Sequence, residues 1–244
     1  MLAAIVLFAT WIILGLPGAL IAIPWTLLTR DIRFLYGMAL TVARIGLRLA
    51  GIRVVVQGRA SLDPRRPCIF LSNHVSNLDP PVLLPVLPHR VSVFIKRSLL
   101  KVPLLGYGMR LAEFIPVDRE GRVEDAIESV QNAAQVLRDG LSIVSFPEGT
   151  RSRDGRLQPF KKGPFYLAME TQAPVVPVSI CGTETMMRKG SVRIYPGTAH
   201  VIFHAPLEPA DYATRDDLLA AVRTAIASGL PERMRPDPPP PTEP

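Results

Sequence analysis

The sequence has few of the residues that cross-link small folds or bind metals. Two cysteines and four histidines occur in 244 residues. Cys68 and Cys181 each lie in or beside an apolar run typical of a strand, which excludes a disulfide scaffold and predicts buried free thiols in a reducing cytoplasm. His200 and His204 share a strand face, but no carboxylate or cysteine cluster completes a metal site around them, so we expect no metal.

Several active-site and recognition motifs are also missing. The chain has no Gly-x-Ser-x-Gly elbow, no P-loop and no Cys-x-x-Cys pair. Gly106 and Gly108 begin a Gly-x-Gly pattern, but Leu111 occupies the third glycine position, which excludes a dinucleotide-binding fingerprint. Aromatic residues make up only 7% of the chain and no nucleic-acid-reading module is recognisable, so we expect no nucleic-acid partner.

Charge is absent from residues 2–29. One helix of that length would extend about 42 Å at ~1.5 Å per residue, more than the ~30 Å hydrocarbon core of a bilayer. Glycines and prolines between residues 15 and 24 interrupt the run, so a broken or re-entrant pair of helices is an equal alternative. The arginines that follow predict that the rest of the chain lies on the cytoplasmic side of a membrane. Residues 34–50 are amphipathic and fit either a headgroup-level helix or one packed on the core.

The remaining chain alternates between strand-like and helical patterns. Short β-branched or apolar runs bounded by Gly, Pro and Asp predict strands, and an apolar stripe over residues 123–138 predicts a helix, which together indicate an α/β sheet. Half of the last 14 residues are proline, which predicts a disordered tail. We therefore expect a helical membrane anchor (1–50), an α/β domain (51–230) and a Pro-rich tail (231–244). The predicted strands are 52–56, 68–71, 91–95, 114–116, 141–146, 175–180, 192–195 and 200–203.

A buried strand ending near residue 71 leads into a loop that carries His74 and Asp79. Reactive groups of α/β folds lie at such strand ends. Five extended residues would separate the two side chains by ~16 Å, so contact requires the loop to coil, which Pro80 at a helix start favours. An aspartate accepting from Nδ1–H would fix the imidazole tautomer and leave Nε2 as a general base. The alternative is that Asp79 only caps the helix.

A second polar turn follows the strand near residue 145 and contains Glu148 and Arg151. Arg151 could hold a phosphate through its guanidinium fork, with Glu148 orienting it or accepting from a substrate hydroxyl. The alternative is an ordinary surface pair of little energetic value. Between the two turns, residues 89–111 contain no acidic residue and five basic ones, which fits either a phosphate-binding surface or a solvated basic face.

Taken together, these blocks resemble the 1-acyl-sn-glycerol-3-phosphate acyltransferase (lysophosphatidic acid acyltransferase) family. Residues 73–79 (Asn-His-Val-Ser-Asn-Leu-Asp) are similar to its His-x4-Asp motif. Residues 96–97 through 115–119 are similar to its second, substrate-binding block, residues 146–152 match the third motif, and residues 176–178 resemble the fourth. Four motifs in the family's order are far more specific than any one of them.

The resemblance implies a mixed α/β sheet flanked by helices, the glycerolipid acyltransferase fold, with an N-terminal helical membrane anchor. It implies transfer of a fatty acyl group from an acyl-CoA or acyl-carrier-protein thioester to the 2-hydroxyl of lysophosphatidic acid, without a cofactor, at a membrane. A related lysophospholipid or glycerophosphate acyltransferase, or a non-catalytic basic membrane-binding module, are the alternatives. The catalytic residues implied are His74 and Asp79. The substrate-binding residues implied are Lys96, Arg97, Arg119, Glu148, Gly149, Thr150 and Arg151.

Overall fold

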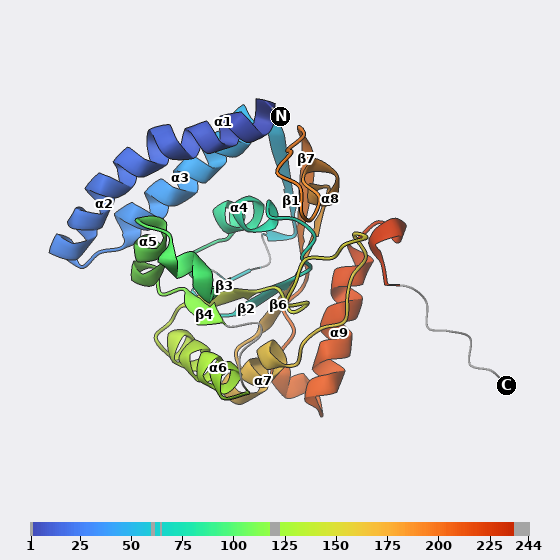
Figure 1. The fold of residues 1–244 in the computed structure, drawn as a ribbon. Coiled ribbons are helices and arrows are strands. Elements are labelled where there is room, and N and C mark those ends of the chain that lie inside the picture. The colour runs from blue at the N-terminus through green and yellow to red at the C-terminus, as the bar shows by residue number, and fades with distance from the viewer. Residues whose placement is uncertain (1, 60–61, 64, 118–122, 237–244) are drawn as a thin grey trace.

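The computed structural model describes residues 2–59, 62–63, 65–117 and 123–236. Across these residues the chain forms a seven-stranded sheet in the order β1-β7-β6-β2-β5-β3-β4 (Figure 1). Its strands are β1 (Ile52–Gln57), β2 (Ile69–Ser72), β3 (Val91–Lys96), β4 (Ile115–Val117), β5 (Ser142–Ser145), β6 (Val175–Cys181) and β7 (Gly197–Phe203). The predicted strand at 192–195 is wrong. Residues 192–195 belong to no strand, and the Tyr195 N–H donates instead to the Met186 carbonyl at 3.0 Å.

The direction of the strands determines which loops meet. The five strands β6, β2, β5, β3 and β4 run parallel, whereas β7 runs antiparallel to β6, and β1 is parallel to β7. The sheet is therefore mixed, as predicted. Every residue of β2 and β5 is buried, which is typical of parallel strands covered by helices on both faces. As a result, the carboxyl ends of β2, β5 and β6 lie on the same side of the sheet as the amino ends of β1 and β7, where the loops that follow and precede these strands meet.

Helices cover both faces of the sheet and divide the core in two (Figure 1). Alternate residues of β2 point to opposite sides: Phe70 packs with α3 and α4, and Ile69 packs with α6, α7 and α9. Leu83 of α4 and Phe165 of α7 are fully buried at the two interfaces. The helices are α3 (Arg33–Leu49), α4 (Asp79–Leu83), α5 (Leu105–Leu111), α6 (Val123–Arg138), α7 (Gly163–Thr171), α8 (Thr183–Met186) and α9 (Arg215–Ser228).

The uncharged N-terminal run forms one continuous helix rather than a broken pair. It consists of α1 (Leu2–Thr10), a π-helical turn (Trp11–Gly15) and α2 (Leu16–Thr29). The π turn lies directly before Pro17, whose ring and missing N–H do not fit regular α-helical geometry. After a left-handed residue at Arg30, α3 returns along α1 and α2, and Leu47 of α3 reaches the core. The hairpin of these helices is thus joined to the α/β unit by packing.

The ordered chain extends past the predicted boundary at residue 230. A 3₁₀ turn covers Glu232–Met234, and the Met234 side chain is only 1% exposed because it packs in the same cluster as α9. The Met234 carbonyl also accepts from the Leu157 N–H at 2.8 Å. A disordered tail starting at residue 231 is therefore wrong for its first residues, since this one apolar side chain anchors them. Residues 237–244 lie outside the described residues.

Both cysteines are free. Cys68 precedes β2 and is buried, and desolvation raises the pKa of its thiol to about 12, so the thiol stays protonated at neutral pH. Cys181 is only half-buried, because it is the last residue of β6 and lies at the carboxyl end of that strand. The prediction of buried free thiols is right for Cys68 and wrong for Cys181.

Candidate active site

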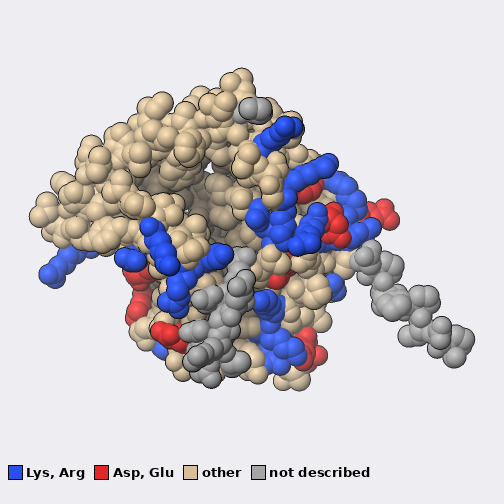
Figure 2. Space-filling model, viewed as in Figure 1, with Lys and Arg blue, Asp and Glu red and all other residues tan. Residues whose placement is uncertain are grey.

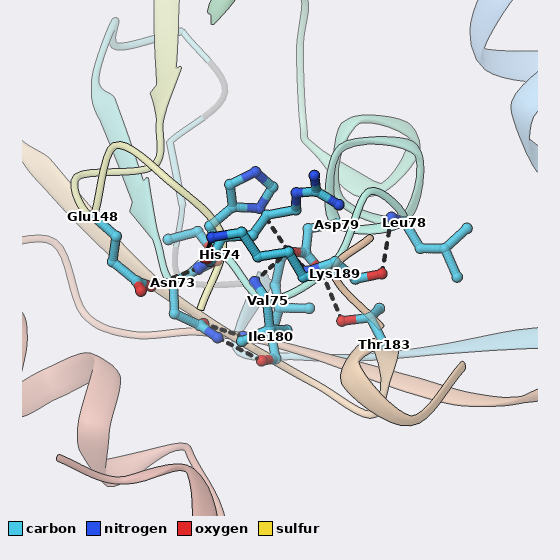
Figure 3. Close-up of polar contacts among 12 residues, drawn as sticks. Asn73, His74, Val75, Leu78, Asp79, Glu148, Ile180, Thr183 and Lys189 are labelled. Carbon is cyan, nitrogen blue, oxygen red and sulfur yellow. Dashed lines mark hydrogen bonds and ion pairs between the residues drawn. The ribbon is translucent and has the colours of Figure 1, made fainter. Parts of the chain in front are cut away.

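The loop between β2 and α4 brings His74 and Asp79 into contact. The His74 Nδ1 atom lies 2.8 Å from the Asp79 Oδ2 atom. Figure 3 draws this contact between the two side chains. Asp79 is fully buried and His74 is 8% exposed. The contact arises because the loop coils back, as predicted for a pair only five residues apart. The helix α4 begins at Asp79, directly before Pro80. The pair therefore sits at the carboxyl end of a central strand.

Asp79 does not act as a helix cap. Leu78 is the N-cap residue of α4, and its side chain makes no capping bond. Asp79 Oδ2 instead accepts from the backbone N–H groups of Val75 and Ser76, each at 2.8 Å. Because an ionised carboxylate only accepts hydrogen bonds, the proton between the pair belongs on His74 Nδ1. The Nε2 atom is then the basic nitrogen of the ring.

A further donor reaches Asp79 from the other side of the site. The Thr183 Oγ1 atom donates to Asp79 Oδ1 at 2.6 Å, and both side chains are fully buried (Figure 3). Thr183 begins α8, directly after β6, so it lies more than a hundred residues away along the sequence. No local sequence pattern links Thr183 to the loop that follows β2, so its role could not be predicted from the sequence. Both carboxylate oxygens are thus held.

Asn73 fixes the same loop to the neighbouring strand. Its side-chain amide donates to the Ile180 carbonyl and accepts from the Ile180 N–H, each at 2.8 Å. This pair of bonds joins the end of β2 to the end of β6. On the other side, Phe146 follows β5 and stacks on the imidazole of His74, with ring centroids 4.3 Å apart. The ring is therefore positioned by three adjacent strand ends.

Glu148 is buried against this loop, and the hydrogen bonds described for its side chain are to backbone N–H groups and not to Arg151. Its Oε1 atom accepts from the His74 N–H at 2.7 Å, and its Oε2 atom accepts from the Gln158 N–H at 3.3 Å. The side chain is 4% exposed. Burial raises the pKa of Glu148 to about 8, although both backbone bonds oppose this shift. We assign Glu148 a positioning role, since both of its oxygens are engaged with backbone.

The turn that follows Phe146 brings three of the predicted residues to the site. Gly149 has a φ of +70°, a conformation that favours glycine, and the Ser152 N–H donates to the His74 carbonyl at 2.8 Å. Lys189, which the sequence did not single out, donates to the Arg151 carbonyl at 2.6 Å and to the Thr150 Oγ1 atom at 3.2 Å. This turn therefore lies against the loop of His74 and carries positive charge.

For the other predicted basic residues that it describes, the structure shows no connection to the loop of His74. Lys96 ends β3 and Arg97 begins the following 3₁₀ turn, and both are exposed. Within the described residues, no hydrogen bond or ion pair joins their side chains to the loop of His74. Arg119 lies outside the described residues. Figure 2 shows Lys and Arg side chains on two sides of a hollow in this face, below the largely uncharged N-terminal helices.

The geometry is suited to removing a proton from a hydroxyl group. The imidazole has a buried carboxylate behind Nδ1, and Nε2 is the nitrogen available to a reactant. Among the described side chains, no serine, threonine or cysteine is hydrogen-bonded to Nε2, so the arrangement is not that of a nucleophilic triad. The nucleophile would therefore come from the substrate, and the adjacent basic turn would suit a phosphate-bearing one.

The chain is similar in sequence and in structure to known acyltransferases. The Acyltransferase family model matches residues 53–181. A 1-acyl-sn-glycerol-3-phosphate acyltransferase of Limnanthes douglasii is 32% identical over 237 residues, which cover 95% of this chain and 83% of that protein. The alpha enzyme of the same name from Homo sapiens is 37% identical over 173 residues, which cover 70% and 60%. The crystal structure of the 1-acyl-sn-glycerophosphate acyltransferase PlsC of Thermotoga maritima is similar with a TM-score of 0.82 and 26% identity, covering 93% of each chain.

Proposed function

The chain belongs to the acyltransferase family, and on that premise we propose that it is a 1-acyl-sn-glycerol-3-phosphate acyltransferase. It transfers a fatty acyl group from a thioester to the 2-hydroxyl of lysophosphatidic acid and makes phosphatidic acid. The observation that carries the proposal is the buried contact of 2.8 Å between His74 and Asp79, beside a basic turn. This contact supplies a base for a hydroxyl, and the turn supplies charge for the acceptor's phosphate.

In the proposed reaction, His74 Nε2 removes the proton of the acceptor hydroxyl as its oxygen attacks the thioester carbonyl. Asp79 stabilises the imidazolium that forms, because its buried carboxylate faces Nδ1–H. The tetrahedral intermediate then collapses, the carbon–sulfur bond breaks, and the imidazolium returns its proton to the leaving thiolate. General-base assistance of this kind contributes about 10²- to 10⁴-fold to the rate.

The acceptor's phosphate is the second element of the proposal. Arg151 is half-buried next to the loop of His74, and a guanidinium can bind phosphate oxygens through two parallel N–H bonds. We assign this contact to Arg151 first, because its turn is hydrogen-bonded to the loop of His74. Lys96, Arg97 and Arg119 are proposed as further contacts on the strength of the sequence motif. The thioester donor, acyl-CoA or acyl carrier protein, brings its own leaving group, and the steps proposed here involve no cofactor.

The N-terminal helix supports a membrane location for the reaction. The run Leu2–Thr29 is long and apolar enough to cross a membrane. Only 11% of its most apolar 18-residue stretch is buried in the protein. Its exposed large apolar side chains are Leu2, Ile5, Phe8, Trp11, Ile12, Ile13, Leu14, Leu16, Leu20, Ile21, Trp25, Leu27 and Leu28. Such a surface is unfavourable in water and favourable in lipid. We propose that the α/β unit lies on the cytoplasmic side, because arginines follow the run at Arg30 and Arg33.

An acceptor panel tests the proposed function. Purified protein in lipid vesicles is given one labelled acyl thioester and, in turn, lysophosphatidic acid, lysophosphatidylcholine and glycerol 3-phosphate. We expect labelled phosphatidic acid from the first acceptor and little product from the others. The basic turn favours the phosphate monoester of lysophosphatidic acid over the choline phosphodiester, and glycerol 3-phosphate lacks the acyl chain. Product from lysophosphatidylcholine or glycerol 3-phosphate alone would replace the proposed acceptor. No acyl transfer to any acceptor would refute the function.

A further inference from the structure

A groove of about 500 Å³ lies where the N-terminal hairpin joins the α/β unit. Its walls come from the carboxyl-terminal half of α3, the edge strand β1, and α4 with the segment that follows it. The half-buried side chains of Val54 and Val86 contribute apolar surface, and three exposed arginines line the groove: Arg44 and Arg48 of α3 and Arg53 of β1. None of the residues lining the groove belongs to the loops that hold His74 or Arg151, so it is separate from the site described above.

The three guanidinium groups share the groove without an anionic partner. Across the described residues, no salt bridge joins Arg44, Arg48 or Arg53 to a carboxylate. Arg44 donates through Nη2 to the Pro85 carbonyl at 2.7 Å, which holds that side chain along the groove wall. Like charges gathered at a concave surface repel one another and focus a positive potential, and a bound anion relieves both effects. The three arginines therefore favour the binding of an anion in the groove.

The chemistry of the lining selects the kind of anion. Guanidinium groups bind phosphate oxygens through parallel N–H bonds, and three of them around one groove can surround a single phosphate. The apolar side chains of Val54 and Val86 beside them suit a ligand that continues into a hydrocarbon or glycerol part. A carboxylate metabolite would use the arginines but gain nothing from this apolar wall. A phosphate group carried by a partly apolar molecule fits both.

The position of the groove relates it to the membrane surface. Ile52 of β1 pairs with Gly197 of β7, and His200 of β7 pairs with Cys181 at the end of β6. The groove, at the amino end of β1, therefore lies at the same end of the strands as the loop of His74. It also adjoins α3, which packs along the apolar helix Leu2–Thr29 (Figure 1). When that helix contacts lipid, α3 lies next to the headgroups, where phosphate is abundant.

From these observations we propose that Arg44, Arg48 and Arg53 form a phosphate-binding groove, separate from the His74 site, that takes the headgroup phosphate of an anionic phospholipid or a free phosphate of the same chemistry. Its occupation by a headgroup would fix the orientation of the sheet edge on the bilayer. The proposal does not depend on the acyl-transfer reaction, because it concerns binding. It can therefore succeed or fail independently of the proposed function.

Charge-preserving variants distinguish a groove from diffuse attraction. The double variant Arg48→Lys/Arg53→Lys keeps both charges but removes the guanidinium forks, whereas Arg48→Gln/Arg53→Gln removes both. Flotation with phosphatidylcholine vesicles, with and without phosphatidylglycerol, measures affinity. We expect the Gln pair to weaken binding to anionic vesicles by about fivefold for each arginine, and the Lys pair to weaken it by about threefold in total. Binding to pure phosphatidylcholine should stay unchanged in both.

A matched control removes the same charge elsewhere. Arg138→Gln/Lys162→Gln takes two exposed cations from α6 and the start of α7, on the opposite face of the sheet, and should leave vesicle affinity within about twofold of wild type. Thermal melting checks that every variant is folded. In a second arm, inorganic phosphate is titrated into detergent-solubilised protein, and the NMR signal of the Arg44 Nε–H group, which every variant retains, is followed. A phosphate-induced shift of the Arg44 signal in wild type that is lost in the Lys pair shows that the groove binds phosphate through the guanidinium groups.

The two arms separate the sources of the ligand. An effect of the Lys pair on vesicles alone identifies a headgroup site, and an effect on phosphate titration alone identifies a soluble-anion site. If the Lys pair behaves as wild type in both arms, the arginines act only as diffuse charge and the groove is not a site. Equal loss in the Arg138→Gln/Lys162→Gln control would overturn the proposal in the same way.

Discussion

Thr183 provides the most specific test of how the imidazole is positioned. The variant Thr183→Val keeps the shape of the side chain but removes the hydroxyl that donates to Asp79 Oδ1 at 2.6 Å. Because both residues are fully buried, no water can replace the donor without local rearrangement. A hydrogen bond to a charged group is worth about 1.5–3 kcal/mol. If that energy holds the carboxylate in place during reaction, its loss corresponds to about a 10- to 150-fold lower kcat.

The assay compares kcat and KM for lysophosphatidic acid in wild type, Thr183→Val and Thr183→Ser. We expect the valine variant to lose kcat with KM nearly unchanged, because Thr183 contacts Asp79 and not the substrate. Serine should restore most of the rate, since it retains the hydroxyl. A kcat within about twofold of wild type for valine, or an equal loss in serine, would refute the reasoning. Melting curves of both variants exclude unfolding as the cause.

Three further predictions follow from the site. Arg151→Ala should raise KM for the acceptor at least tenfold and leave kcat nearly unchanged, because a phosphate contact is made before the reaction; an unchanged KM in steady-state kinetics removes Arg151 from the pocket. Glu148→Gln should flatten the pH dependence of stability between about 4.5 and 8, since the raised pKa of Glu148 makes ionisation unfavourable in the folded state, so stability is present at low pH and lost as pH rises. Urea unfolding across that range measures this, and parallel curves for the two proteins contradict it. Asn73→Ala should lower the free energy of unfolding by about 1–3 kcal/mol, because it leaves the buried N–H and carbonyl of Ile180 without partners; a loss below about 0.5 kcal/mol by the same method would show that the clamp is weak.

Local sequence patterns predicted the parts of the site that lie within one strand and its loop. His74 and Asp79 could be paired because a buried strand ends before them and Pro80 starts a helix after them, so only a coiled loop fits. The mixed α/β sheet followed from the family resemblance and from strands that alternate with helices. The strand at 192–195 failed because β-branched and aromatic residues also occur in exposed extended segments.

Residues that reach the site from other strands could not be found in this way. Thr183 and Phe146 meet His74 and Asp79 only because β6 and β5 flank β2, and strand order is a property of the whole fold. Glu148 was expected to orient Arg151 or to accept from a substrate hydroxyl, because the sequence shows its charge and not its burial. Its contact with the His74 N–H depends on how two loops pack together. Contacts between residues of different strands thus depend on strand order and loop packing, which local sequence patterns do not show.

The most direct test of the central claim is the single-turnover rate of acyl transfer to lysophosphatidic acid in His74→Ala and Asp79→Asn. If His74 is the general base and Asp79 holds its tautomer, the alanine variant should be slower by about 10²- to 10⁴-fold, and the asparagine variant should also be strongly impaired. Both should still bind anionic vesicles as wild type does. A folded His74→Ala variant that transfers the acyl group at close to the wild-type rate would contradict the account.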